Sequence, residues 1–241
     1  MSWLIDFWHM IWPHLGRGLL VTLKLSGGAL LIGFLLGLPT ALIRVYGSPW
    51  AKRLATLYVD VFRGTPLLVQ LFFIYYGLAD PHLTTLAESI GLPPSLLVLP
   101  PMTAAYAALG LNSGAYQAEY FRGAIQAVSG GQMMAARALG MSRWQAIRHI
   151  VLPQALRIAI PPWSNEAAYL VKYTSVVYII AVPDLFGEAR RIMSVHYNQM
   201  IMLPFVGFIY LLMVLFITWV MGKVEAALRI PGLEMEEQER F

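Results

Sequence analysis

The chain has 241 residues, of which 58% are hydrophobic and only 12% are charged. A soluble domain carries roughly a quarter charged residues, so the composition predicts an integral membrane protein. The net charge of +4 then indicates basic loops at a membrane face rather than nucleic-acid binding, and the absence of cysteine excludes disulfides and thiolate metal sites.

Five stretches of the sequence are apolar and long enough to cross a bilayer as helices, which takes about 20 residues. They cover approximately residues 19–43, 54–78, 96–118, 158–182 and 200–222. We therefore predict an all-α fold with five transmembrane helices in a single transmembrane domain over residues 1–241. The third stretch is rich in small residues that favour close helix packing in lipid, namely Ala104, Ala105, Ala107, Ala108 and Gly110.

Lys and Arg are distributed unevenly among the connections between these stretches. The connections after the first, third and fifth stretches hold three, five and three of them. The second connection holds none, and the fourth holds Arg190 and Arg191. The positive-inside rule therefore predicts a multi-pass protein whose N-terminus is outside and whose C-terminus is cytoplasmic. It also places the long basic loop at residues 122–157 in the cytoplasm.

Within that loop, residues 134–153 read as two short helices joined by a hinge. Gly140 is placed to end the first helix, because glycine tolerates a left-handed backbone. Ser142 and Gln145 are spaced as a capping box that starts the second helix, and Pro153 closes the segment. The second helix carries an apolar face of Trp144, Ile147 and Val151. The pattern indicates either a docking loop for another protein or an amphipathic segment on anionic lipid.

The spacing in this loop resembles that of one family of membrane proteins. Residues at the required intervals are Ala135, Ala136, Gly140, Ile150, Leu152 and Pro153, and Met134 replaces the family's glutamate. The segments 62–70, FRGTPLLVQ, and 118–125, AEYFRGAI, resemble two further segments of that family. The chain thus resembles a permease subunit of the binding-protein-dependent ABC importers, in the polar amino acid uptake family of histidine, glutamine and arginine permeases.

The resemblance implies a type I ABC importer permease whose coupling helix, between transmembrane helices 3 and 4, sits in a cleft of a separate ATPase. The implied ATPase-docking residues are Met134, Ala135, Ala136, Gly140, Ser142, Trp144, Ile150, Leu152 and Pro153. The other implied partners are an extracytoplasmic amino-acid-binding protein, a second permease subunit (itself or a homologue) and the lipid of the bacterial cytoplasmic (inner) membrane. The sequence has no Gly-x4-Gly-Lys-Ser/Thr phosphate loop, so we expect no enzyme activity and no bound cofactor, with ATP used by the partner subunit.

The expected cargo is a polar or charged amino acid, and the alternatives are another small polar solute or an ion-coupled secondary transporter. A secondary transporter would need more spans or an internal repeat. A membrane-embedded enzyme would need convergent catalytic groups. The five histidines are scattered without metal-ligand spacing, so we predict no catalytic residues and no metal site.

Polar residues inside the apolar stretches are the candidate substrate contacts, because ionisable groups in a membrane are costly. The candidates are Asp60, Thr65, Pro66, Gln70, Asn165, Glu166 and Tyr169. Structural alternatives remain open: an ion pair between Asp60 and Arg63, and a packing kink at Gly64 and Pro66. Lys172 lies six positions after Glu166, so the two do not share a helical face and are not expected to pair with each other. Thr174 and Ser175 are placed to donate hydrogen bonds to backbone carbonyls one turn back. Glu119 and Arg122 are expected to form a solvated ion pair.

Overall fold

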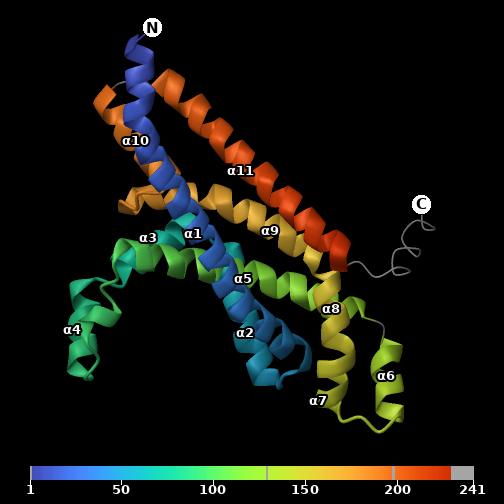
Figure 1. Ribbon diagram of the computed structural model, residues 1–241. Coiled ribbons are helices and arrows are strands. Elements are labelled where there is room, and N and C mark those ends of the chain that lie inside the picture. Colours follow the sequence, from blue (N-terminus) through green and yellow to red (C-terminus); the bar gives the residue numbers. More distant parts are fainter. Residues whose placement is uncertain (1, 129, 197–198, 229–241) are drawn as a thin grey trace.

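Two long helices frame the protein, α1 (Ser2–Tyr46) and α11 (Gln199–Leu228) (Figure 1). The computed structural model describes residues 2–128, 130–196 and 199–228, and this part of the chain contains helices and no strand. The remaining elements are α2 (Pro49–Gly64), α3 (Leu67–Phe72), the π-turn η1 (Phe73–Gly77), α4 (Pro81–Ser89), the 3-10 turn η2 (Pro94–Leu96), α5 (Pro101–Ala127), α6 (Gly130–Ala138), α7 (Arg143–Ala146), the π-turn η3 (Ile147–Val151), α8 (Leu152–Ile158), α9 (Ile160–Tyr173), the 3-10 turn η4 (Thr174–Ile180) and α10 (Leu185–His196).

The helices that meet the requirements of a membrane span are fewer than the five predicted stretches. Residues 11–46 of α1 and the whole of α11 are long and apolar enough on their own. Two bent pairs also qualify if each counts as one span: α2 with 67–77, bent by 108°, and 160–180 with 185–195, bent by 49°. The described residues thus contain two to four candidate spans. Helix α5 is not among them, because polar residues such as Asn112 and Gln117 lower its hydropathy.

The break in the second predicted stretch confirms the expectation from Gly64 and Pro66. Helix α2 ends at Gly64, and Thr65 and Pro66 have extended backbone angles before α3 starts at Leu67. Proline has no N–H to donate to the preceding turn, so the helix cannot continue through it unbent. The stretch 54–78 is therefore two helices that meet at a sharp angle.

Helix ends differ from the prediction in two other places. Helix α1 starts at Ser2 rather than near residue 19 and passes through Pro13 and Pro39 without ending. The connection 80–94 contains a helix, α4, that was not predicted. Its signals were present, because Asp80 accepts a hydrogen bond from the His82 N–H at 2.9 Å and Pro81 occupies the first turn.

Helix α1 crosses α5 at close range, and small residues make this approach possible. A Cβ atom on Gly37 of α1 would lie 2.9 Å from the Gly114 carbonyl oxygen and 3.0 Å from the Ala118 nitrogen of α5. Ala104, Ala105 and Ala108 of α5 are fully buried. This confirms the close packing predicted for the third stretch.

Three apolar clusters divide the interior. The first joins α1 and α5 to α3 and η4, and the second joins α1 to α10 and α11. The third lies where α1 and α5 meet the loop that follows α5; it contains Ala41, Phe121 and Ile125 together with Val151 and Ala155. The basic loop is therefore anchored to the two helices that cross most closely.

Candidate functional site: docking loop and polar core

The loop after α5 forms a hairpin of α6 and α7, at the lower right of Figure 1. Gly140 has φ of +85°, donates its N–H to the Arg137 carbonyl at 3.0 Å, and is followed by Met141, which donates to the Ala136 carbonyl at 3.1 Å. This pair of bonds is a Schellman motif, in which a left-handed residue closes the helix. The predicted hinge at Gly140 is confirmed.

The second helix of the hairpin starts with the predicted capping box. The Gln145 N–H donates to Ser142 Oγ at 3.3 Å, and the Ser142 N–H donates to Gln145 Oε1 at 2.8 Å. The expectation that Pro153 closes the segment is wrong, because α8 continues to Ile158. The π-helical segment η3 ends at Val151, and Pro153 is the second residue of α8, in a first turn where a missing N–H costs little.

The hairpin exposes most of the predicted docking residues. Met134 and Trp144 are 69% and 62% exposed, and Ala135, Gly140, Ser142 and Pro153 are also exposed. Ile150 and Leu152 are half-buried, while Ala136 is buried in the hairpin. Leu139 is 85% exposed and was missed; its signal was an apolar residue directly before the glycine hinge.

Two of the three residues of the predicted apolar face point inward. Ile147 and Val151 are buried, whereas Trp144 is exposed. The Arg143 guanidinium lies 5.4 Å from the centre of the Tyr46 ring at the end of α1, a cation–π distance. The hairpin is thus held to the helical body on one side and presents Met134, Leu139 and Trp144 on its open surface.

Gln70 satisfies the backbone that the break at 64–66 leaves unpaired. Its Nε2 donates to the carbonyl oxygens of Phe62 at 2.8 Å and Thr65 at 3.0 Å, and to Thr65 Oγ1 at 2.9 Å. Asn112 of α5 donates to Gln70 Oε1 at 3.0 Å and to the Phe62 carbonyl at 3.1 Å. Irregular backbone at membrane depth needs such partners, so Gln70 has a structural role in addition to the substrate contact predicted for it.

Glu166 is enclosed in a second polar network between α5 and α9. It is only 3% exposed, and it accepts hydrogen bonds from Ser113 Oγ at 2.7 Å and from the Tyr120 hydroxyl at 3.3 Å. Gln117 extends the network, since its Nε2 donates to Ser113 Oγ at 2.9 Å and its Oε1 accepts from Trp163 Nε1 at 2.8 Å. Both carboxylate oxygens therefore have protein partners.

The expected ion pairs are arranged differently from the prediction. Arg63 does not pair with Asp60 within the described residues; its Nη1 lies 3.6 Å from Glu119 Oε1. Arg44 donates to the same Glu119 oxygen, and Arg122 Nη2 donates to Oε2 at 2.6 Å. Glu119 and Arg122 do pair, but the expectation that the pair is solvated is wrong. Three arginines from α1, α2 and α5 surround one carboxylate whose side chain is only 16% exposed.

The arginines around Glu119 set the protonation state of its carboxylate. Glu119 lies just beyond the predicted span 96–118. Burial alone would raise the pKa of Glu119, but hydrogen bonds and attraction from Arg122 and Arg44 outweigh it and hold the pKa below its ordinary value. The cluster keeps a surplus of positive charge at the end of α5.

The other candidate substrate contacts remain accessible. Asp60, Thr65, Pro66 and Asn165 are exposed, and Tyr169 is 45% exposed. Tyr169 stacks on Tyr173 at 6.1 Å between ring centres, and Lys172 Nζ lies 4.2 Å from the centre of the Tyr169 ring. Glu166 and Lys172 thus have separate partners, as expected, although Lys172 lies over a ring of its own helix α9 and Glu166 alone bonds across to α5.

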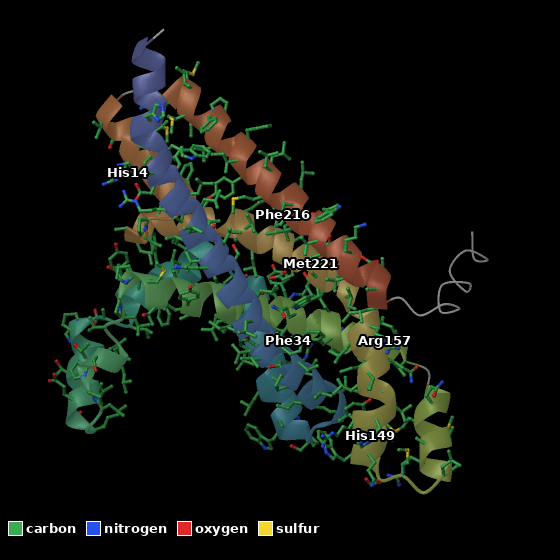
Figure 2. The ribbon with its side chains drawn as sticks, viewed as in Figure 1. His14, Phe34, His149, Arg157, Phe216 and Met221 are labelled. Atoms are coloured by element: carbon green, nitrogen blue, oxygen red, sulfur yellow. The ribbon has the colours of Figure 1, made fainter. Side chains whose placement is uncertain are left out.

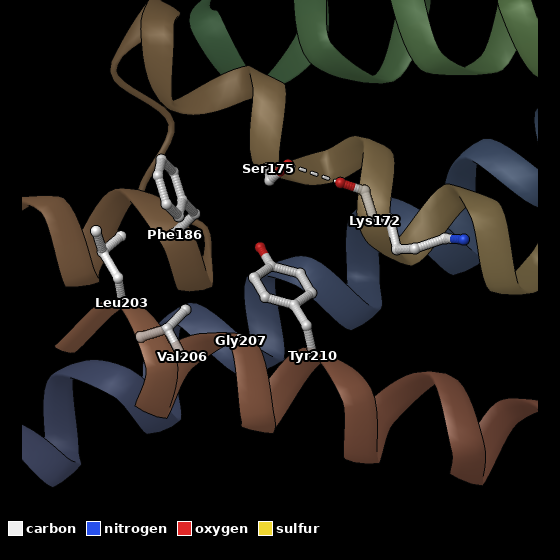
Figure 3. A pocket seen from close by; sticks show the side chains of 7 residues that line it. All are labelled: Lys172, Ser175, Phe186, Leu203, Val206, Gly207 and Tyr210. Carbon is white, nitrogen blue, oxygen red and sulfur yellow. Dashed lines mark hydrogen bonds between the residues drawn. The ribbon is translucent and has the colours of Figure 1, made fainter. Parts of the chain in front are cut away.

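A pocket of about 250 Å³ lies between η4, α10 and α11 (Figure 3). Lys172, Phe186 and Tyr210 are among its lining residues.

The Ser175 hydroxyl donates to the Lys172 carbonyl at 2.7 Å, and the Thr174 hydroxyl donates to the Val171 carbonyl at 2.9 Å. These bonds confirm the predicted backbone role of both hydroxyls. Among the residues that the structure describes, no three His, Cys, Asp or Glu side chains come together as metal ligands.

Comparison with known proteins decides the family. Residues 29–230 match the family described as "Binding-protein-dependent transport system inner membrane component". The chain belongs to this family. It is therefore an inner-membrane permease. The chain is 40% identical over 212 residues to the nopaline transport system permease protein NocM of Agrobacterium fabrum, and the match covers 88% of this chain and 85% of NocM.

Two further relatives cover nearly the whole permease. It is 32% identical over 226 residues to the glutamine transport system permease protein GlnP of Escherichia coli strain K12, covering 92% and 98% of the two chains. It also superimposes on a chain of a crystal structure titled as an amino acid ABC transporter with histidines, with a TM-score of 0.76, 37% identity and coverage of 89% and 94%. The permease thus has the fold of ABC importer membrane subunits.

Proposed function

We propose that this permease is the membrane-spanning subunit of an ATP-driven importer for polar or charged amino acids. One observation carries the proposal: a hairpin fixed by a Schellman motif and a capping box exposes Met134, Leu139 and Trp144, in the segment for which the sequence resemblance implies ATPase docking. Large apolar side chains gathered on an exposed surface are typical of protein contact sites. The occupant proposed for this surface is a separate ABC ATPase subunit.

Coupling follows from how the hairpin is fastened. Val151 and Ala155 share the third cluster with Ala41 of α1 and Phe121 of α5. A push on the hairpin is therefore passed to the two closely crossing helices. Closure of two ATPases would tilt paired permeases between inward-facing and outward-facing arrangements, with ATP bound and hydrolysed only by the ATPases.

The amino-acid cargo is proposed from the relatives, which are named for transport of nopaline and glutamine. We assign the substrate contacts to the exposed candidates Asp60, Thr65, Asn165 and Tyr169. Gln70 and Glu166 support the pathway from behind, because both side chains are buried as well as bonded to protein groups.

The proposed arrangement in the cell follows the charge count. All five predicted stretches span the bacterial inner membrane, with α5 as the third span, the N-terminus outside and the hairpin in the cytoplasm. Because one chain encloses no pathway, a second permease subunit completes it. An external amino-acid-binding protein delivers the substrate.

The test is reconstitution of the permease with its ATPase and binding protein in liposomes. Uptake of a labelled amino acid should require ATP, and a scan of single amino acids would identify the cargo. Uptake of only non-amino-acid solutes would support the alternative of another small polar cargo. Uptake by the permease alone, driven by an ion gradient, would support a secondary transporter instead.

A further inference from the structure

An apolar groove of about 340 Å³ lies beside the docking loop, where α11 ends. Its walls come from Phe34 of α1, Phe121 of α5, Leu156 of α8 and Trp163 of α9, and from Val224 and Leu228 at the end of α11. Figure 2 labels two of the lining residues, Phe34 on α1 and Arg157 on α8. Leu228 is the last residue of α11, so the chain leaves the described structure at the rim of the groove.

The sequence that follows is suited to turning back onto this groove. Residues 230–233 are Ile-Pro-Gly-Leu, with proline and glycine at the second and third positions of a type II turn. Such a turn brings its first and fourth residues within 7 Å of each other. Ile230 and Leu233 are large apolar residues that follow Leu228 closely in the sequence.

Charge complementarity indicates the same occupant. Arg157 lines the groove, and it forms no ion pair with any of the described residues. Beyond Leu233 the sequence holds four glutamates, at 234, 236, 237 and 239, against the two arginines at 229 and 240. An acidic run thus begins directly after Leu233. Each residue of an extended chain spans about 3.3–3.6 Å, so these glutamates are within reach of Arg157 when Leu233 lies in the groove.

We propose that residues 229–241 act as a strap: Ile230 and Leu233 fill the groove, and the glutamates that follow pair with Arg157. The strap fastens the end of α11 to α8, the helix that continues the docking loop. Movement of the loop is then carried into α11 as well as into α1 and α5. The transmission of movement into α11 rests on the proposed function, whereas occupation of the groove does not.

The absence of native cysteine allows a direct test by disulfide cross-linking of the full chain in its native membrane. The variant Leu156→Cys with Leu233→Cys should form an intrachain disulfide, read by mass spectrometry of the linked peptides. The control pairs Leu233→Cys with Leu139→Cys, which is 85% exposed on the hairpin, and measures random encounters. A bound strap should give about tenfold more disulfide than the control, because it raises the local concentration of the two thiols.

Charge reversal separates the strap from other occupants. Arg157→Glu should lower the disulfide yield, and adding Glu236→Arg and Glu237→Arg to it should restore the yield. Equal yields in test and control pairs would overturn the strap. So would a copurified phospholipid that protects Leu156→Cys from a thiol reagent, or a disulfide that disappears when the ATPase subunit binds. Normal uptake in Arg157→Glu despite a lowered disulfide yield would instead count against the proposed coupling through α11 alone.

Discussion

Replacement of Gly140 tests whether the shape of the hairpin sets its affinity for the ATPase. Its φ of +85° lies in the left-handed region, and a Cβ atom there would meet nothing within 4 Å. The penalty is therefore conformational and not steric: about 1–2 kcal/mol for an ordinary L-residue. Since 1.4 kcal/mol is tenfold, Gly140→Ala should weaken binding of the ATPase roughly 5- to 30-fold if the hairpin must hold its Schellman turn to dock.

The side chains tolerated at Gly140 predict an order of affinities. Asparagine enters the left-handed region more easily than alanine, and β-branched valine least easily, so ATPase affinity should fall from Gly140→Asn to Ala to Val. Gly130→Ala is the matched control, because Gly130 has open space and no positive φ. Titration of the ATPase onto the permease in nanodiscs measures the series. The reasoning is refuted if Gly140→Val binds as tightly as Gly140→Asn or if uptake is unchanged.

Three further predictions concern the helical body, each read as apparent thermal stability in detergent. Gly37→Ala should lower the free energy of unfolding by about 1–3 kcal/mol, because its Cβ would meet backbone of α5 at 2.9–3.0 Å. Gly27→Ala, whose Cβ would meet nothing within 4 Å, should not lower it, and equal melting temperatures for the two variants would contradict the close crossing. Gln70→Leu leaves the Thr65 carbonyl without its side-chain donor and should lose about 1–3 kcal/mol, and an unchanged melting temperature would show that the break needs no amide. Glu119→Gln should destabilise at neutral pH, and because the fold lowers the pKa of Glu119, the difference from wild type should vanish as the pH falls through that lowered value; a difference that grows in acid would have the wrong sign.

Local signals in the sequence predicted the local structure of the docking loop. Gly140 and the pair of Ser142 and Gln145 each act through hydrogen bonds to neighbours within five residues, so their spacing alone predicts the turn. The break at Pro66 follows from the missing N–H in the same way. Pro153 was misjudged because a π-turn, which has no clear sequence signature, places it in a first turn.

Long-range polar contacts were not predictable from spacing. The partners of Glu166 are 46 and 53 residues away, and the Arg44 partner of Glu119 is 75 residues away. Sequence spacing favoured pairing Asp60 with Arg63, but the crossing of α2 over α5 brings Arg63 to Glu119 instead. Asn112, Ser113 and Gln117 inside an apolar stretch were the available sign that a buried network exists there.

The most direct measurement of the central claim is ATP-dependent uptake in liposomes that contain the permease, its ATPase and its binding protein. We expect accumulation of a polar or charged amino acid that requires ATP and the ATPase, and that is lost in Gly140→Val while Gly130→Ala transports normally. Equal uptake without the ATPase, or normal uptake by Gly140→Val, would contradict the account of a permease driven through its docking hairpin.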